Sequence, residues 1–247
     1  MLNIHNKKLV LIKPVMVIFD TDNTLYAYEF ANKAAEEAAC KKAFNLIGID
    51  RSTFFSFYRK ARSEIKLTLG KTASGHSRLL YFQRMIELLG LRAELLLALD
   101  LEQTFWRTFL ANAPLFENVK NTLMLLRENN IPIGVVTDLT SHVQMRKLTY
   151  FGLEDMFDAV VTSEEVGADK PDPRNFELLL YKLKINNMKN VWMVGDDPVA
   201  DIEGAKKLGA IAFQKVTNDI NFSEYDIKPD VSFNSFFDLM KLINKII

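Results

Sequence analysis

The fold is decided by the stretch Val15-Met16-Val17-Ile18-Phe19-Asp20-Thr21-Asp22-Asn23-Thr24-Leu25. Its first five residues are apolar and β-rich and stop at Asp20, which is typical of a strand buried on both faces of a parallel sheet. The carboxylates of Asp20 and Asp22 then fall in one turn, where they can converge. Because crowded carboxylates raise each other's pKa unless a cation intervenes, this turn indicates a site for a hard cation such as Mg²⁺, although Asp and Asn also simply form turns.

The sequence that follows this stretch is of two kinds. Residues 27–110 hold four long helical patterns separated by glycines, with few strand signals. The helices expected there are Glu29–Ile47, Arg51–Leu69, Ser77–Leu89 and Ala93–Leu110. From Pro114 onward, short apolar strands alternate with helices, which favours a doubly wound parallel α/β sheet. We therefore expect a Rossmann-like core from residues 1–26 and 111–247, with residues 27–110 inserted as a helical cap domain.

The alternation after Pro114 gives specific expectations. The expected strands are Ile131–Val136, Ala159–Thr162, Val191–Val194, Ala210–Phe213 and, at an edge, Asp230–Phe233. The expected helices are Asn118–Asn129, Ser141–Phe151, Pro173–Lys184, Pro198–Leu208 and a final helix. In such a sheet, ligands bind beyond the carboxyl ends of the strands, so the residues that follow the strands are the candidates for function.

Composition excludes several classes of protein. Basic and acidic residues number 31 each, so no nucleic-acid partner is expected, and the single cysteine, Cys40, excludes an intramolecular disulfide. The apolar run Leu9–Phe19 after Lys7 and Lys8 resembles a signal peptide, but Lys13 and Pro14 interrupt it and no small-residue cleavage site follows. We expect that run to be a buried strand, and the protein to be cytoplasmic, without membrane contact, and a monomer or homodimer.

Polar residues follow three further predicted strands. Thr137-Asp138 can hold an anionic oxygen or cap the next helix. Lys170 lies between turn residues in Gly167–Pro173, which would fix its ammonium group, although a loop lysine is often only exposed. Gly195-Asp196-Asp197 and Asp201 place three carboxylates around one glycine, beyond what a helix N-terminus requires. An acidic cluster with one lysine suits Mg²⁺-dependent phosphoryl transfer, since cation and lysine offset phosphate charge while a carboxylate attacks.

The order of these motifs resembles the haloacid dehalogenase-like hydrolase superfamily, in its phosphatase branch with a type 1 helical cap. Asp20-Thr21-Asp22-Asn23-Thr24 matches its first motif, Thr137 its second, Lys170 its third, and Gly195-Asp196-Asp197 with Asp201 its fourth. The resemblance covers residues 15–25 and about 112–235, and the insert stands where that family has its cap. Each motif alone is weak, but the combination is specific.

The resemblance implies catalytic roles. Asp20 would be the nucleophile that forms an aspartyl-phosphate, and Asp22 the general acid and base. Thr137 and Lys170 would hold the phosphoryl oxygens. Asp138 would lie beside the substrate where the family often has Asn, and its charge favours a side chain that points away from the phosphate.

The resemblance also implies a metal. Mg²⁺ would be bound by Asp20, by the backbone carbonyl of Asp22, and by Asp196. Asp201 or Asp197 would complete the shell, and the spacing of Asp201 is the better match to the family. The expected activity is hydrolysis of a small phosphate ester, either a sugar phosphate or a nucleoside monophosphate, since the form with Asn in the first motif looks like some nucleotidase and acylneuraminate-phosphatase members.

Other functions of the same superfamily use some of these residues. A dehalogenase needs neither Asp22 nor Mg²⁺, so the presence of Asp22 and Asp196 favours phosphate-ester hydrolysis. A phosphomutase would use the same groups, and a silent phosphate-binding or interaction protein would share the fold. Phosphonate hydrolysis would need an activated cap lysine, and nothing marks Lys66 or Lys71 as one.

The most polar interruption of the cap is the segment Gly70–Arg78. Its clustered donors suggest that His76, Arg78 or Lys71 contacts the polar part of the substrate. The alternative is a solvated loop between helices.

Overall fold

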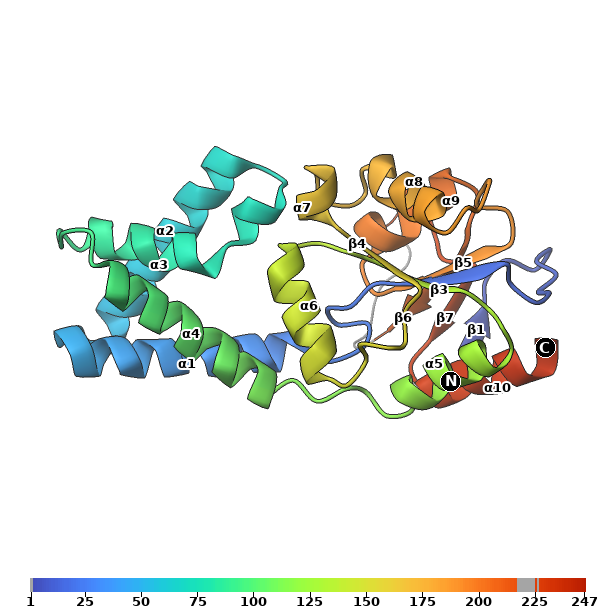
Figure 1. The fold of residues 1–247 in the computed structure, drawn as a ribbon, viewed down its shortest axis with the longest axis horizontal. Coiled ribbons are helices and arrows are strands. Elements are labelled where there is room, and N and C mark those ends of the chain that lie inside the picture. Colours follow the sequence, from blue (N-terminus) through green and yellow to red (C-terminus); the bar gives the residue numbers. More distant parts are fainter. Residues whose placement is uncertain (1, 217–224, 226) are drawn as a thin grey trace. The chain divides into compact units, whose positions relative to one another are not determined.

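The computed structural model describes residues 2–216, 225 and 227–247, and it consists of two compact units (Figure 1). Unit 1 comprises Met1–Ala27 and Leu115–Ile247, and unit 2 comprises Tyr28–Pro114. Unit 2 is therefore inserted into the sequence of unit 1. Among the described residues, no helix has both the length and the apolar character needed to span a bilayer.

Unit 1 is built on a seven-stranded sheet in the order β1-β7-β6-β5-β2-β3-β4. The strands are β1 Leu2–Ile4, β2 Met16–Phe19, β3 Ile133–Thr137, β4 Ala159–Thr162, β5 Val191–Gly195, β6 Ile211–Lys215 and β7 Val231–Phe233. All neighbours are parallel except β1, which pairs antiparallel with β7. The predicted parallel α/β fold is confirmed, with one antiparallel strand added at its edge.

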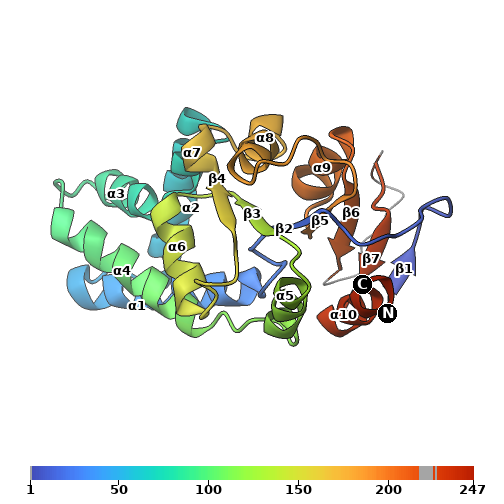
Figure 2. The same cartoon turned by 45° about the vertical axis from the view of Figure 1, so that its right-hand side comes forward.

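Helices cover both faces of this sheet (Figures 1 and 2). Helices α5 (Val119–Glu128) and α10 (Phe236–Ile246) pack together on one face, and α8 (Pro173–Lys182) lies on the other with α9 (Gly204–Lys207). This double cover explains why the residues of β2, β3 and β5 are buried along their whole length.

Several details of unit 1 differ from the sequence-based expectations. Within the apolar run Leu9–Phe19 only β2 is a strand, and the exposed Val10, Ile12 and Val15 lie outside it. The expected edge strand near Asp230 is not at the edge, because β1 covers it. That N-terminal strand was not predicted, because three residues are too few to show the alternation of apolar and polar side chains that identifies a strand.

The expected helix Pro198–Leu208 is also interrupted. It begins as the π-helix η2 (Pro198–Glu203) and continues as the short helix α9. Two further helices follow β3 in the sequence before α8. Helix α6 (Ser141–Tyr150) was predicted, and helix α7 (Ser163–Val166) was not.

Unit 2 is entirely helical among its described residues. Its elements are α1 (Tyr28–Ile47), α2 (Arg51–Leu69), the 3₁₀ turn η1 (Ala73–His76), α3 (Arg78–Leu88) and α4 (Leu95–Ala111). Helix α1 packs on α4, and α2 packs on α3. The four long helices match the predicted ones to within two residues at each end.

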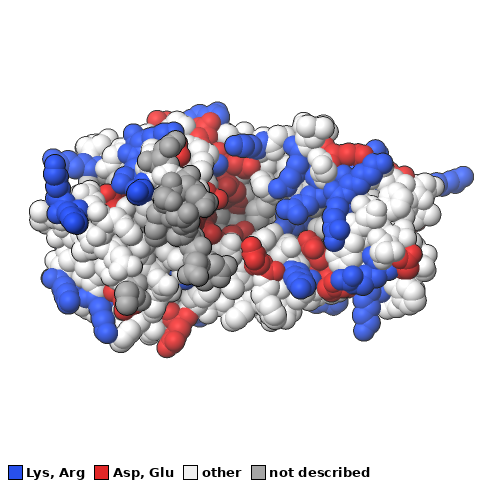
Figure 3. All heavy atoms as spheres, turned by 180° about the vertical axis from the view of Figure 1, so that it is seen from behind, with Lys and Arg blue, Asp and Glu red and all other residues white. Residues whose placement is uncertain are grey.

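The core of unit 2 is aromatic. Phe54, Phe82, Phe105 and Phe109 are all fully buried, and Tyr58 stacks on Phe54 with ring centroids 5.7 Å apart. Phe54 and Tyr58 of α2 are therefore part of the packed core, as large buried rings usually are. Basic and acidic side chains both occur on the face drawn in Figure 3.

Candidate active site

The predicted site residues of unit 1 gather at the carboxyl ends of its central strands. Asp20 directly follows β2, Asp196 directly follows β5, and Thr137 is the last residue of β3. Phe19 pairs with Val194 across β2 and β5, so the residues that follow these two strands start from the same level of the sheet. The first turn also has the expected backbone, since Asn23 adopts a left-handed φ of 59°, which Asn tolerates better than most residues.

Asp20 is held on both of its carboxylate oxygens. The ammonium group of Lys170 donates to Oδ1 at 2.6 Å, and the hydroxyl of Thr24 donates to Oδ2 at 3.1 Å. Only 6% of Asp20 is exposed. Burial raises the pKa of Asp20 to about 7, against the opposing charge of Lys170 and with the help of the nearby Asp201 and Asp22.

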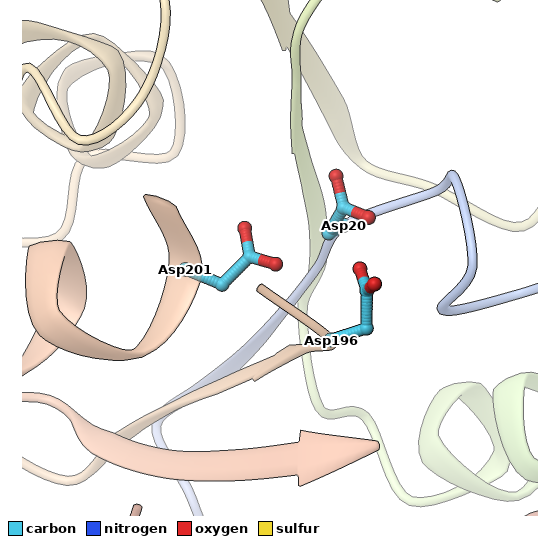
Figure 4. A group of neighbouring side chains, drawn as sticks. All are labelled: Asp20, Asp196 and Asp201. Carbon is cyan, nitrogen blue, oxygen red and sulfur yellow. The ribbon is translucent and has the colours of Figure 1, made fainter. Parts of the chain in front are cut away.

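Three carboxylates converge on one point. Asp20, Asp196 and Asp201 each offer an oxygen, and these oxygens all lie within 4.8 Å of one another. Figure 4 shows the three side chains turned toward each other from β2, from the end of β5 and from η2. Burial and the neighbouring Asp20 and Asp201 raise the pKa of Asp196 to about 9, and burial also raises the pKa of Asp201. These residues form an acidic triad that could bind a metal, since mutual repulsion favours a cation between them.

The geometry separates Asp201 from Asp197. Asp197 caps η2, and its carboxylate accepts from the backbone N–H groups of Val199 and Ala200 at 2.8 Å each. Asp201 points into the triad, where its Oδ2 accepts from the backbone N–H of Asp197 at 3.0 Å. A Cβ atom at Gly195 would lie 2.3 Å from that Oδ2, so only glycine lets Asp201 approach this closely.

Lys170 links two carboxylates of the triad, those of Asp20 and Asp201. Its ammonium group also donates to Oδ1 of Asp201 at 2.6 Å, and only 6% of the residue is exposed. Burial alone lowers the pKa of Lys170, but the charges of Asp20 and Asp201 outweigh it and raise the pKa well above its usual value. The lysine is therefore a permanently charged group in direct contact with Asp20.

Asp138 acts on the loop that carries Lys170. Its Oδ1 accepts from the backbone N–H of Lys170 at 2.9 Å. Burial raises the pKa of Asp138 to about 6. The side chain thus has a backbone partner within unit 1.

Thr137 lies in a buried network of hydroxyl groups. Its Oγ1 hydrogen-bonds the hydroxyl of Thr21 at 2.7 Å and accepts from the side-chain amide of Gln144 at 2.8 Å. The same amide donates to the backbone carbonyl of Asp138 at 2.6 Å. Gln144, on α6, therefore fixes the turn after β3.

Asp22 has a buried cationic partner that the sequence did not reveal. Lys147, also on α6, donates to both carboxylate oxygens of Asp22, at 2.8 and 3.2 Å. The hydroxyl of Tyr26 donates to Oδ1 of the same carboxylate. The only signal in the sequence was the spacing of Gln144 and Lys147, three residues apart on one face of a helix.

The two predicted substrate residues of the cap lie within unit 2. Arg78 is 7% exposed, and its guanidinium donates to the backbone carbonyl of His76 at 2.7 Å and to the hydroxyl of Tyr28. It also lies over the ring of Phe105, with 5.2 Å to the ring centroid. Within unit 2, Arg78 therefore holds the loop that carries His76, and a contact of either residue with substrate stays a prediction.

Asp20, Asp196 and Asp201 therefore form an acidic candidate active site at the carboxyl edge of the parallel sheet. The family model for haloacid dehalogenase-like hydrolases matches residues 16–209, so the chain belongs to that family, and the predicted membership is confirmed.

Three relatives place the chain within this family. It is 41% identical to a ribulose-1,5-bisphosphate 5-phosphatase of Halopiger xanaduensis, over 78% of this chain and 81% of that protein. It is 31% identical to a glyceraldehyde 3-phosphate phosphatase of Methanopyrus kandleri, over 79% and 81% respectively. The structure of a phosphatase of the same family from Thermococcus onnurineus superposes with a TM-score of 0.69 at 25% identity, covering 92% of this chain and 97% of that one.

Proposed function

We propose that this chain is a Mg²⁺-dependent phosphoric monoester hydrolase that acts on small sugar phosphates. The observation that carries the proposal is Asp20, a buried carboxylate bound to Lys170 inside an acidic triad at the carboxyl edge of the sheet. The names of the relatives support it, since two of them are phosphatases of sugar phosphates. They favour sugar phosphates over nucleoside monophosphates.

The first half of the proposed reaction transfers the phosphoryl group to Asp20. A carboxylate oxygen of Asp20 attacks phosphorus, the ester P–O bond breaks, and Asp22 gives a proton to the departing oxygen. Lys170 and Thr137 stabilise the phosphoryl oxygens, because an ammonium group and a hydroxyl both donate to anionic oxygen.

The second half returns the enzyme to its starting state. Asp22, now ionised, takes a proton from water, whose oxygen attacks the phosphorus of the aspartyl-phosphate. The bond between Asp20 and phosphorus breaks, inorganic phosphate leaves, and both carboxyl groups regain their first protonation states.

The residues present fit a hard divalent cation. We propose that Asp20, Asp196 and the backbone carbonyl of Asp22 bind Mg²⁺, with Asp201 supporting them. These are oxygen groups only, which is the donor set that Mg²⁺ prefers. Bound Mg²⁺ would offset the charge of the phosphoryl group and of the carboxylates around it.

For unit 2 we propose the role of a cap that selects the leaving group, with His76 and Arg78 as its candidate residues. His76→Ala and Arg78→Ala should then change KM or kcat on the true substrate, more than on an aryl phosphate with no sugar to recognise. Unchanged constants for both variants would remove this part of the proposal.

Phosphate release from a panel of sugar phosphates, nucleotides and small phospho-acids tests the proposal. Purified protein with Mg²⁺ should release phosphate from sugar phosphates most efficiently, and EDTA or Asp20→Asn should abolish release. Asp155→Asn, which removes an exposed carboxylate of the same unit, is the matched control and should retain activity. Release that persists in Asp20→Asn would refute the mechanism, and loss of substrate without phosphate release would indicate a phosphomutase.

A further inference from the structure

Lys147 is a charged residue in a buried position. It is 1% exposed, and burying an ammonium group is costly unless it is paired and hydrogen-bonded. Its partner is Asp22, which it contacts through both carboxylate oxygens. A contact with both oxygens restricts the position of the carboxylate and also the rotation of its plane.

Tyr26 restrains the same carboxylate from a second direction. Its hydroxyl donates to Oδ1 of Asp22, and the residue is 1% exposed. The ring packs against Phe151 with centroids 4.8 Å apart, and the ammonium of Lys147 lies 5.7 Å from the ring centroid. The donors around Asp22 are therefore themselves fixed by packing, which is what accurate placement of a reacting group requires.

Helix α6 connects this arrangement to the other side of the site. Gln144 and Lys147 point from the same helix, one to Thr137 and the other to Asp22. At the same time 28% of the Asp22 side chain is exposed, so a substrate can reach it.

We infer that Lys147 is a positioning residue for Asp22, and that α6 aligns the proton-transfer group with the phosphoryl-binding turn at Thr137. The inference rests on the proposed function, because it assumes that Asp22 protonates the leaving oxygen. Lys147 favours the ionised carboxylate, so Asp22 has to take up a proton before it can act as the acid, and the ionised form is the one that takes a proton from water in the second half of the reaction. In this inference the ammonium group of Lys147 acts through the carboxylate of Asp22, which it contacts at both oxygens.

The test compares two kinds of leaving group. An alkyl phosphate, such as a sugar phosphate, needs protonation of its leaving oxygen, whereas p-nitrophenyl phosphate releases a stable phenolate without it. Lys147→Met should lower kcat on the alkyl ester roughly 10-fold to 100-fold, part of what a general acid contributes. On p-nitrophenyl phosphate the loss should be several times smaller, and KM should change little on either substrate. Lys147→Arg should restore most of the activity on the alkyl ester.

A double-variant cycle tests whether Lys147 works through Asp22. In an Asp22→Asn background, Lys147→Met should have almost no further effect on kcat, because coupled residues are not additive. Arg146→Met is the matched control, since it removes an exposed positive charge from the adjacent position of the same helix and should leave kcat unchanged. Tyr26→Phe, which removes only a hydroxyl, should show the same preferential loss on the alkyl ester, and it provides the comparison if Lys147→Met does not fold.

The outcomes separate this inference from the proposed function. Equal losses on both substrates, or additive losses in the Asp22→Asn background, would overturn the positioning role while the wild type remains a phosphatase. An inactive wild type, or an active Asp20→Asn variant, would instead refute the proposed function.

Discussion

Replacing Asp20 with Asn should flatten the pH dependence of stability in the metal-free protein. Burial raises the pKa of Asp20 from 3.8 to about 7. The folded state therefore binds a proton more tightly than the unfolded state. The unfolding free energy therefore falls as the pH rises toward about 7, where folded Asp20 loses its proton. Above that pH, Asp20 causes no further fall.

The magnitude follows from the same values. At pH 5 the carboxyl group of an unfolded chain is already ionised, whereas that of folded Asp20 keeps its proton until about pH 7. Over these roughly two pH units, at about 1.36 kcal/mol per unit, the unfolding free energy falls by about 3 kcal/mol. Asp196 also has a raised pKa, so its titration lowers the unfolding free energy in the same direction. The comparison is therefore between wild type and variant in how steeply the unfolding free energy falls with pH.

Urea unfolding in EDTA between pH 5 and pH 8 measures this slope. The chain has two tryptophans, and a Trp106→Phe background leaves Trp192 in β5 as a fluorescent reporter inside unit 1. Asp20→Asn should lose about 3 kcal/mol less than wild type over this range, while the control Asp155→Asn should follow wild type. Parallel curves for wild type and Asp20→Asn would refute the reasoning. Mg²⁺ should stabilise the wild type more at pH 8 than at pH 5, because the cation binds the ionised carboxylates.

Three further predictions follow from the site and the sheet. Gly195→Ala should weaken Mg²⁺ binding roughly 10-fold to 100-fold by displacing Asp201, as measured by titration calorimetry, and unchanged affinity would contradict the role of the close approach. Lys170→Met should destabilise unit 1 by about 3–5 kcal/mol near pH 8, because it leaves two buried carboxylates unpaired. Near pH 5 the loss should be smaller, since Asp20 then takes up a proton, and equal losses in urea unfolding at both pH values would contradict this. Asp230→Ala removes the acceptor of a backbone N–H of β6 and should cost about 1–3 kcal/mol of unfolding free energy. The kcat of its folded fraction should not change, and a lower kcat would indicate that this edge of the sheet affects the site.

The features that could be predicted from the sequence are those that local patterns encode. The strand that ends at Asp20 and the alternation after Pro114 each depend on neighbouring residues, and both are present in the structure. The same holds for the groups at the strand ends, because parallel topology brings Asp20, Asp196 and Thr137 to one edge once the strands are known.

What could not be predicted depends on contacts between distant residues. Lys147 pairs with Asp22 across 125 positions, so its partner cannot be identified from the helix that carries it. Leu9–Val15 is apolar enough to resemble a strand, yet no neighbouring strand pairs with it in the described sheet. The burial of Arg78 likewise depends on rings from α3 and α4 that come together only in the folded unit 2.

The insertion of unit 2 has a consequence for the order in which the chain can fold during synthesis. β2 pairs with β3 and β5, yet both are translated only after the whole of residues 28–114. Unit 2 contains its own helix contacts and can fold as soon as it emerges, as domains generally do. The apolar β2, by contrast, has no pairing partner at either edge until β3 and β5 have been translated. β1 has no partner until β7 has been translated. Unpaired strand edges associate readily with other chains, so the apolar strand that precedes Asp20 is a segment that a nascent chain must protect while unit 2 is being made.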